Sequence, residues 1–162
     1  MSPLKGYQSK IIVLLTQQEL ILAELYRFFA SLYPDLRDFW SDLSREQMEH
    51  ATWVEYCYKK TEEGAVTFEE GKIKTYTVES FVKYLEENLA KVKEKAPSPQ
   101  GAFSLALGIE NSLLIKRVFD HFQSGDQELS TLLGSLREKK QEHLKRLEIQ
   151  STPFSGLTRT RK

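Results

Sequence analysis

The stretch IVLLTQQELILAELYRFFASL, from Ile12 to Leu32, decides the fold. At steps of three and four residues it carries Ile12, Leu15, Glu19, Leu22, Tyr26 and Phe29. This is the spacing of a single helix face, and all of these residues except Glu19 are apolar or aromatic. Pro34 follows shortly afterwards and disfavours further helix. The stretch therefore predicts a long helix whose buried face carries one carboxylate.

Three further stretches have the same helical spacing. The first starts at about Asp35 or Ser41 and ends at Lys60, the second covers residues 102–122, and the third runs from Asp126 to about Glu148. Between the first two lies a segment from about residue 64 to 100. It carries an extended or hairpin-like part around Val66, Phe68 and Ile73, and then a helix over residues 77–95.

Two helix pairs joined by one long crossover are typical of a ferritin-like four-helix bundle. We therefore expect an all-α fold with two antiparallel pairs and an extra helix in the crossover at about 64–100. Residues 1–150 form a single domain in this interpretation. Residues 151–162 lose the periodicity and are predicted to be a flexible C-terminal tail.

The composition of the 162 residues excludes several classes of function. Twenty-three basic residues balance 23 acidic ones, which argues against binding to nucleic acid or to an anionic membrane. The single Cys57 excludes an intramolecular disulfide and a metal site made of cysteines alone. No apolar run is long enough for a membrane span, and no secretory signal is recognisable. The sequence predicts a reduced, soluble, cytoplasmic domain.

Polar residues on the predicted inward faces are the informative ones, because burying them is unfavourable unless they are paired. Two of the helices each carry one inward carboxylate. Each of the other two carries a polar residue followed three positions later by a His. The six residues are Glu19, Gln47, His50, Glu110, Lys140 and His143. A bundle that binds two metals uses a Glu from each of two helices and Glu-x-x-His from the other two. Here Gln47 and Lys140 occupy the positions of the two missing carboxylates.

The chain resembles the rubrerythrin-like proteins over residues 12–148. The resemblance rests on the spacing of Glu19, His50, Glu110 and His143, together with four segments of sequence. These are Glu19–Tyr26 continuing to Tyr33-Pro34, Phe39-Trp40 with Leu43 and EQMEHA (46–51), LALGIE (105–110), and residues 136–144.

The resemblance implies a non-haem di-iron centre in a family whose members act on peroxide or oxidise or store iron. With only Cys57, the chain cannot contain the Cys-rich rubredoxin module of longer members. By the family pattern, Gln47 and Lys140 replace the bridging carboxylates. An amide is a weak ligand, and an ammonium only donates hydrogen bonds and repels a cation. By analogy with ferritin-like bundles we also expect a homodimer.

Each of these residues also has a simpler explanation. Glu19 and Glu110 could be partly exposed, Lys140 could extend to solvent along its methylene chain, and Gln47 could form a capping box with Ser44. His50 and His143 could be core histidines bonded to carbonyl groups. Glu46 and His50, four residues apart, could form a surface ion pair.

Three functions follow as hypotheses. The first is a rubrerythrin-like protein whose di-iron site has degenerated, acting as a non-catalytic binding or structural module in which Lys140 replaces the metal charge. The second is a surviving metalloprotein, in which Glu19, His50, Glu110 and His143 hold iron, zinc or manganese. The third is an assembly protein that pairs its helices with those of a second copy.

Overall fold

The computed structural model describes residues 6–62, 66–68, 75–116, 122–124 and 127–160. These residues form an almost entirely helical fold with α1 (Gly6–Leu32), α2 (Arg37–Glu62), α3 (Thr75–Glu94), α4 (Pro99–Lys116) and α5 (Gln127–Thr160). A single 3-10 turn, Pro34–Leu36, joins α1 to α2. Pro34 suits the first position of that turn because its fixed φ favours helix and its missing N–H has no partner there. The expected all-α class is confirmed.

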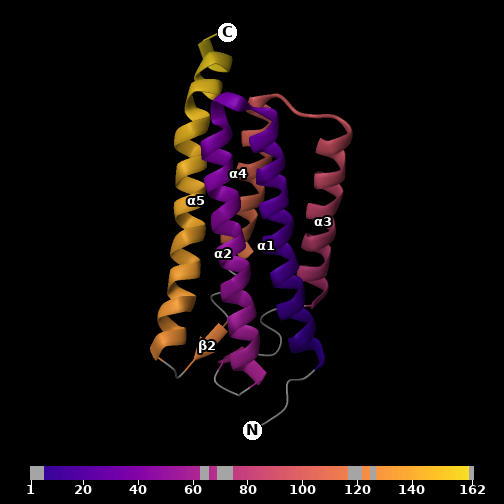
Figure 1. The fold of residues 1–162 in the computed structure, drawn as a ribbon, viewed down its shortest axis with the longest axis vertical. Helices are drawn as coiled ribbons and strands as arrows, with labels where there is room; N and C mark the ends of the chain where they lie inside the picture. The colour runs from indigo at the N-terminus through magenta and orange to yellow at the C-terminus, as the bar shows by residue number, and fades with distance from the viewer. Residues whose placement is uncertain (1–5, 63–65, 69–74, 117–121, 125–126, 161–162) are drawn as a thin grey trace.

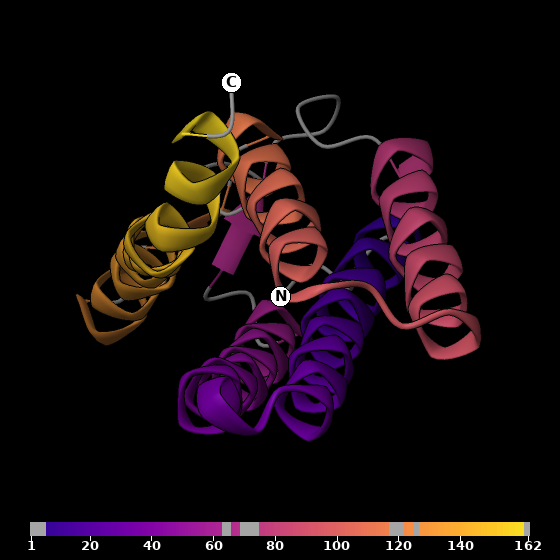
Figure 2. The same ribbon diagram turned by 90° about the horizontal axis from the view of Figure 1, so that it is seen from above.

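The long helices lie side by side along the molecule. Helices α1 and α2 form one antiparallel pair, and α4 and α5 form a second (Figure 1). Helix α3 packs against α1, on the side away from α5 (Figure 2). The first pair is held closely: the Ser44 hydroxyl of α2 donates to the Ala23 carbonyl of α1 at 2.7 Å. Small side chains at these two positions allow the close approach.

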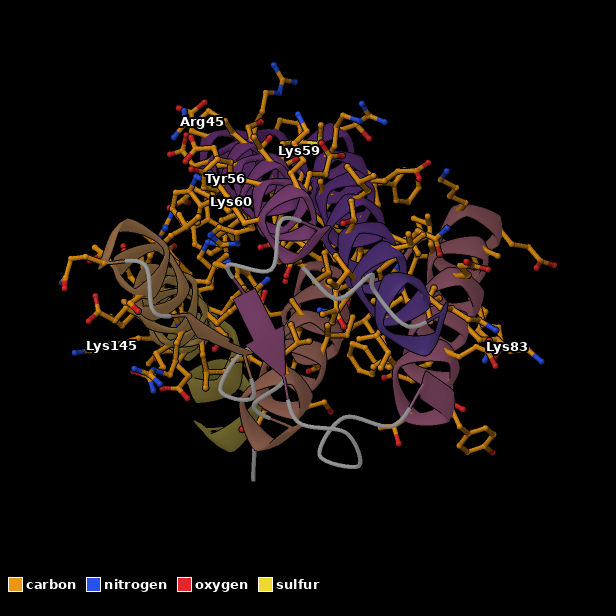
Figure 3. All side chains as sticks on the ribbon, turned by 90° about the horizontal axis from the view of Figure 1, so that it is seen from below. Arg45, Tyr56, Lys59, Lys60, Lys83 and Lys145 are labelled. Carbon is orange, nitrogen blue, oxygen red and sulfur yellow. The ribbon has the colours of Figure 1, made fainter. Side chains whose placement is uncertain are left out.

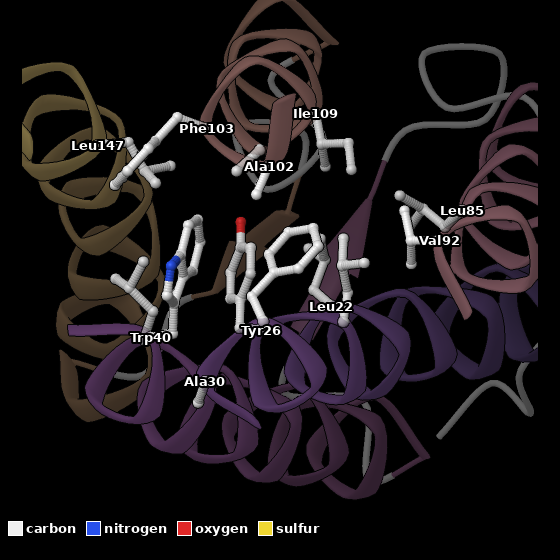
Figure 4. Close-up of a cluster of buried hydrophobic side chains, with 14 of the residues drawn as sticks. Leu22, Tyr26, Ala30, Trp40, Leu85, Val92, Ala102, Phe103, Ile109 and Leu147 are labelled. Carbon is white, nitrogen blue, oxygen red and sulfur yellow. The ribbon is translucent and has the colours of Figure 1, made fainter. Parts of the chain in front are cut away.

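The apolar core lies between the two pairs and is rich in aromatic side chains. Trp40 is fully buried, and its ring lies 4.9 Å from Phe29, 5.1 Å from Phe103 and 5.5 Å from Tyr26, measured between centroids. Leu22, Leu85, Ile109 and Leu147 extend the cluster onto α1, α3, α4 and α5 (Figure 4). Aromatic contacts at these separations stabilise packing beyond the area they bury. The inward stripe predicted for α1, Ile12 to Phe29, is buried throughout.

The predicted end of the third long helix is wrong. We expected helix to Phe122, but α4 ends at Lys116 and Phe122–Ser124 is strand β2. Strand β2 pairs antiparallel with β1 (Val66–Phe68), so the extended part predicted around Val66 and Phe68 is confirmed. The pairing is made by backbone groups of two segments far apart in the sequence, and helical periodicity does not indicate it. Ile73 and residues 117–121 lie outside the described residues.

The predicted end of the last helix is also wrong. We expected it near Glu148, with a flexible tail from residue 151, but α5 continues to Thr160. Ser151 is buried, and the hydroxyls of Ser151 and Thr152 both donate to the Glu148 carbonyl at 2.9 Å. Pro153 removes only one backbone donor, and the helix passes through it.

None of the helices in the described part of the chain combines the length and apolarity needed to cross a membrane.

Candidate functional site

The six polar residues singled out in the sequence are all buried. Their exposed fractions are Glu19 0%, Gln47 0%, His50 1%, Glu110 0%, Lys140 2% and His143 0%. They come from α1, α2, α4 and α5, and we call them, with the contacting Tyr26 and Glu46, the polar cluster. Partial exposure of Glu19 and Glu110 and extension of Lys140 to solvent are therefore excluded. Gln47 lies well inside α2, so the capping box is excluded as well.

Lys140 is the central cation of the polar cluster. Its Nζ donates to Glu19 Oε2 at 2.5 Å and to Gln47 Oε1 at 3.0 Å. A buried charge is tolerated only when it is paired and hydrogen-bonded, and both conditions are met here. Lys140 thereby joins α5 to both helices of the first pair.

His50 is the neutral member of the cluster. Its Nδ1 lies 2.9 Å from Gln47 Oε1 and 3.9 Å from Glu19 Oε2. Burial and the positive charges of Lys140 and His143 lower the pKa of His50 to about 2. The imidazole therefore stays uncharged at neutral pH. Because the Gln47 amide oxygen can only accept, this contact requires the tautomer with the proton on Nδ1.

His143 occupies the opposite position, between two carboxylates. Its Nδ1 lies 3.7 Å from Glu110 Oε1, and its Nε2 lies 3.7 Å from Glu46 Oε2. Burial opposes its protonation, but the two carboxylates outweigh it and raise the pKa of His143 above the ordinary value. The rings of His143 and His50 are 5.1 Å apart. The pKa values of the two histidines are thus shifted in opposite directions.

Glu110 is held on its other side by an aromatic hydroxyl. Tyr26 Oη donates to Glu110 Oε1 at 2.7 Å, across α1 and α4. Burial alone would raise the pKa of Glu110, but Lys140, His143 and Tyr26 together lower it below the ordinary value. For Glu19 the balance is reversed: burial raises its pKa, although Lys140 opposes the shift.

Glu46 belongs to this cluster, which the sequence did not indicate. The Arg146 guanidinium donates to both of its oxygens through Nη1, at 2.7 and 3.0 Å. These partners lower the pKa of Glu46 to about 2, with His143 as the largest cause. The alternative of a surface ion pair between Glu46 and His50 is excluded, because His50 is buried and Glu46 contacts His143 and Arg146 of α5. The feature of the sequence that could have indicated a buried role for Glu46 was Arg146, a cation three residues after His143.

Several buried atoms of the cluster have no hydrogen-bond partner among the described residues. They are Glu19 Oε1, Gln47 Nε2, Glu110 Oε2 and both ring nitrogens of His143. Buried polar groups usually have a hydrogen-bond partner, so the hydrogen bonding of the cluster is incomplete at these atoms.

The residues present do not fit a centre of two metals. Two bridging carboxylates are needed to neutralise and link two hard cations, and Gln47 and Lys140 stand in their place. The Lys140 ammonium bonds the very oxygens that would face a metal, on Glu19 and Gln47. The described residues contain no group of three or more His, Cys, Asp or Glu placed to hold a metal ion. Cys57 carries no described side chain.

Comparison of the chain with models of protein families, with curated proteins and with solved structures finds no match.

Proposed function

We propose that this protein is a rubrerythrin-like, ferritin-fold protein whose di-iron site has become a metal-free polar cluster, and that it acts as a non-catalytic binding or structural module. The helix directions support the fold assignment. Helices α1 and α5 run one way and α2 and α4 the other, and the crossover that joins the pairs carries α3 (Figure 1). This is the connectivity of a bundle with one long crossover.

The observation that carries the proposal is the placement of the Lys140 ammonium. It bonds Glu19 and Gln47, one from each helix of the first pair, with 2% of Lys140 exposed. In a di-metal bundle the metals neutralise the inward carboxylates. Here Lys140 supplies a positive charge, and Glu110 and Glu46 raise the pKa of the neighbouring His143, which favours a second. In this proposal side-chain charge takes the place of the charge of bound metals.

The contacts of the cluster favour a structural role for it. Lys140 connects α5 to α1 and α2, Tyr26 connects α1 to α4, and Arg146 connects α5 to α2. Paired members of a buried polar network specify one arrangement of the helices, and Lys140, Tyr26 and Arg146 are the paired members here. The cluster would then fix the bundle as a rigid support, while binding takes place on an outer surface.

Unfolding measurements on Lys140 test the proposal. We expect Lys140→Ala to lower the free energy of unfolding by roughly 3–5 kcal/mol, because it leaves the buried Glu19 carboxylate uncompensated. Lys139→Ala is the matched control: the neighbouring side chain is 41% exposed and lies 3.5 Å from Glu142. The control should change stability by less than about 0.5 kcal/mol.

A double variant separates charge from packing. Glu19→Gln with Lys140→Met removes both charges at similar volume, so it should recover much of the stability lost in Lys140→Ala. If Lys140→Ala is no more destabilising than Lys139→Ala, the charge-replacement proposal is wrong.

A surviving metalloprotein is the second candidate function, and the unpartnered atoms favour it. Glu110 Oε2 and both nitrogens of His143 lack hydrogen-bond partners in the described part of the chain, and Glu110 and His143 lie 3.7 Å apart. A carboxylate and an imidazole are ligands for a single iron, zinc or manganese ion. With Glu19 and His50 they would form the predicted set, provided that Lys140 moves aside. Metal content decides between the two candidates.

A further inference from the structure

A shallow groove of about 460 Å³ runs along the outer face of the α1/α2 pair. Its walls come from both helices, and its lining residues are Leu20, Ala23, Glu24, Arg27, Ser41, Ser44, Arg45 and Met48. The lining extends over residues 20–27 of α1 and 41–48 of α2, which corresponds to roughly 10 Å, or two helical turns, on each. Ala23, Ser41 and Ser44 are small, so the groove is hollow at its middle. It lies on the opposite side of the pair from the apolar core.

The groove has an apolar end. Leu20 is 39% exposed and Met48 is 50% exposed, and both line the groove. Val13, seven residues before Leu20 and therefore on the same face of α1, is 47% exposed. A run of exposed apolar side chains beside a hollow is more typical of a binding surface than single exposed residues are. Methionine in particular adapts to the shape of a partner.

The groove's other end is cationic. Arg27 lines this end, and Arg45 lines the groove between it and Met48, with a side chain that is 66% exposed on the outer side of α2 (Figure 3). Glu24 is the carboxylate in the lining, and Lys93 of α3 neutralises it at 2.7 Å. Asp42 lies 3.4 Å from Arg45. Arg27 has no carboxylate partner among the described residues. Three cations thus face two carboxylates, and the unpaired charge is positive.

We propose that this groove binds an acidic amphipathic helix of a partner protein. Helix-in-groove recognition uses apolar anchors about one and two turns apart, which matches the length of the groove. An apolar side chain of the partner would enter between Leu20 and Met48. A carboxylate one to two turns along would meet Arg27, for which bidentate pairing is favourable. The inference rests on the proposed function as a binding module and names its surface and the class of its partner.

A pair of synthetic peptides tests the proposal on the full-length protein. The first is a helix-forming peptide of about fifteen residues, with leucines on one face and glutamates flanking them. The second has the same sequence with lysine in place of each glutamate. Fluorescence anisotropy of labelled peptide should show saturable binding of the acidic peptide and at least tenfold weaker binding of the basic one. Equal binding of the two, or none, overturns the proposal.

Variants place the binding on the groove. Arg27→Glu and Met48→Glu should each weaken binding of the acidic peptide at least tenfold. Lys83→Glu is the matched control, because Lys83 is an exposed cation on α3, away from the groove, and should change the affinity less than twofold (Figure 3). If Lys83→Glu weakens binding as much as Arg27→Glu, the interaction is a general charge effect and the groove is not the site.

Sedimentation of the same proteins tests whether a second copy of the chain occupies the groove instead. If the unmodified protein is a dimer that Met48→Glu converts to a monomer, the groove holds a second copy and the acidic-helix proposal is overturned. None of the groove residues touches Lys140 in the described contacts, so failure of peptide binding leaves the Lys140 stability test unchanged. The two proposals can therefore fail separately.

Discussion

At the scale of single residues, the polar cluster contains two histidines whose pKa values are shifted in opposite directions. His50 stays neutral because burial and two neighbouring cations hold its pKa near 2. His143 lies between Glu110 and Glu46, and these two carboxylates raise its pKa. A symmetric metal site would treat two such histidines alike. Their opposite shifts arise because His143 lies 3.7 Å from both Glu110 and Glu46, whereas the positive charge of Lys140 lowers the pKa of both histidines.

Glu46 gives a pH-dependent prediction at this scale. Its folded-state pKa, about 2, lies below the ordinary 4.5, so it stabilises the fold above pH 4.5 and loses that contribution as pH falls toward 2. A shift of this size corresponds to at most roughly 3 kcal/mol. Glu46→Gln should therefore lower the free energy of unfolding near neutral pH. The difference from the unmodified protein should shrink steadily below pH 4.5.

Denaturant unfolding at a series of pH values measures this difference. Glu49→Gln is the control, since Glu49 is an exposed carboxylate on the same helix. A difference between Glu46→Gln and the unmodified protein that stays constant from neutral pH down to the acid range would show that Glu46 is not held by His143 and Arg146.

Much of the candidate site could be predicted from helical spacing alone. Glu19, Gln47, Glu110 and Lys140 interrupt apolar stripes at steps of three or four, so burial of the stripe buries them too. Glu46 could not be found in this way, because it stands at the edge of the α2 stripe. Whether it faces solvent or α5 depends on how α2 is rotated against α5, and the sequence of one helix does not contain that angle.

At the scale of helices and strands, the buried faces and most helix boundaries were predicted well, but α1 starts at Gly6 instead of Ile12, and the ends of α4 and α5 differ from the prediction. Phe122, the last residue predicted for the third long helix, lies in strand β2, which pairs with β1 more than fifty residues earlier in the chain. Pairing across such a separation leaves no local signal. Helix α5 passes through Pro153, a residue that local preference assigns to a helix boundary. In both places tertiary context determined the outcome.

Glycines inside helices provide the prediction at this scale. Gly108 in α4 and Gly134 in α5 have nothing within 4 Å of an added Cβ. Alanine favours helix over glycine by roughly 0.5–1 kcal/mol, so Gly108→Ala and Gly134→Ala should each raise the free energy of unfolding by about that amount.

Gly101, in the first turn of α4, serves as the contrast. An added Cβ there would lie 3.2 Å from Pro97 Cβ and 3.4 Å from Ser98 Oγ, so the gain should be smaller or absent in Gly101→Ala. Thermal unfolding of the three variants compares them directly. A loss of stability in Gly108→Ala or Gly134→Ala would mean that the glycine is not in an open helical position.

At the scale of the whole molecule, the two helix pairs meet over an aromatic core at one level and the polar cluster at another. Trp40 and Phe103 pack between the pairs, while Lys140 and Glu19 join them by charge. In this account the outer face of the α1/α2 pair is left for binding. The arrangement depends on one replacement, an ammonium for bound metal.

The metal content of the purified protein tests that replacement most directly. The protein is purified without chelator, incubated anaerobically with Fe(II), desalted and analysed for metals, alongside Gln47→Glu with Lys140→Glu. The account predicts a folded protein that retains no metal, while the double variant, with two Glu-x-x-His units rebuilt, retains iron. One or two metal ions retained per chain by the unmodified protein would contradict the account and favour the metalloprotein.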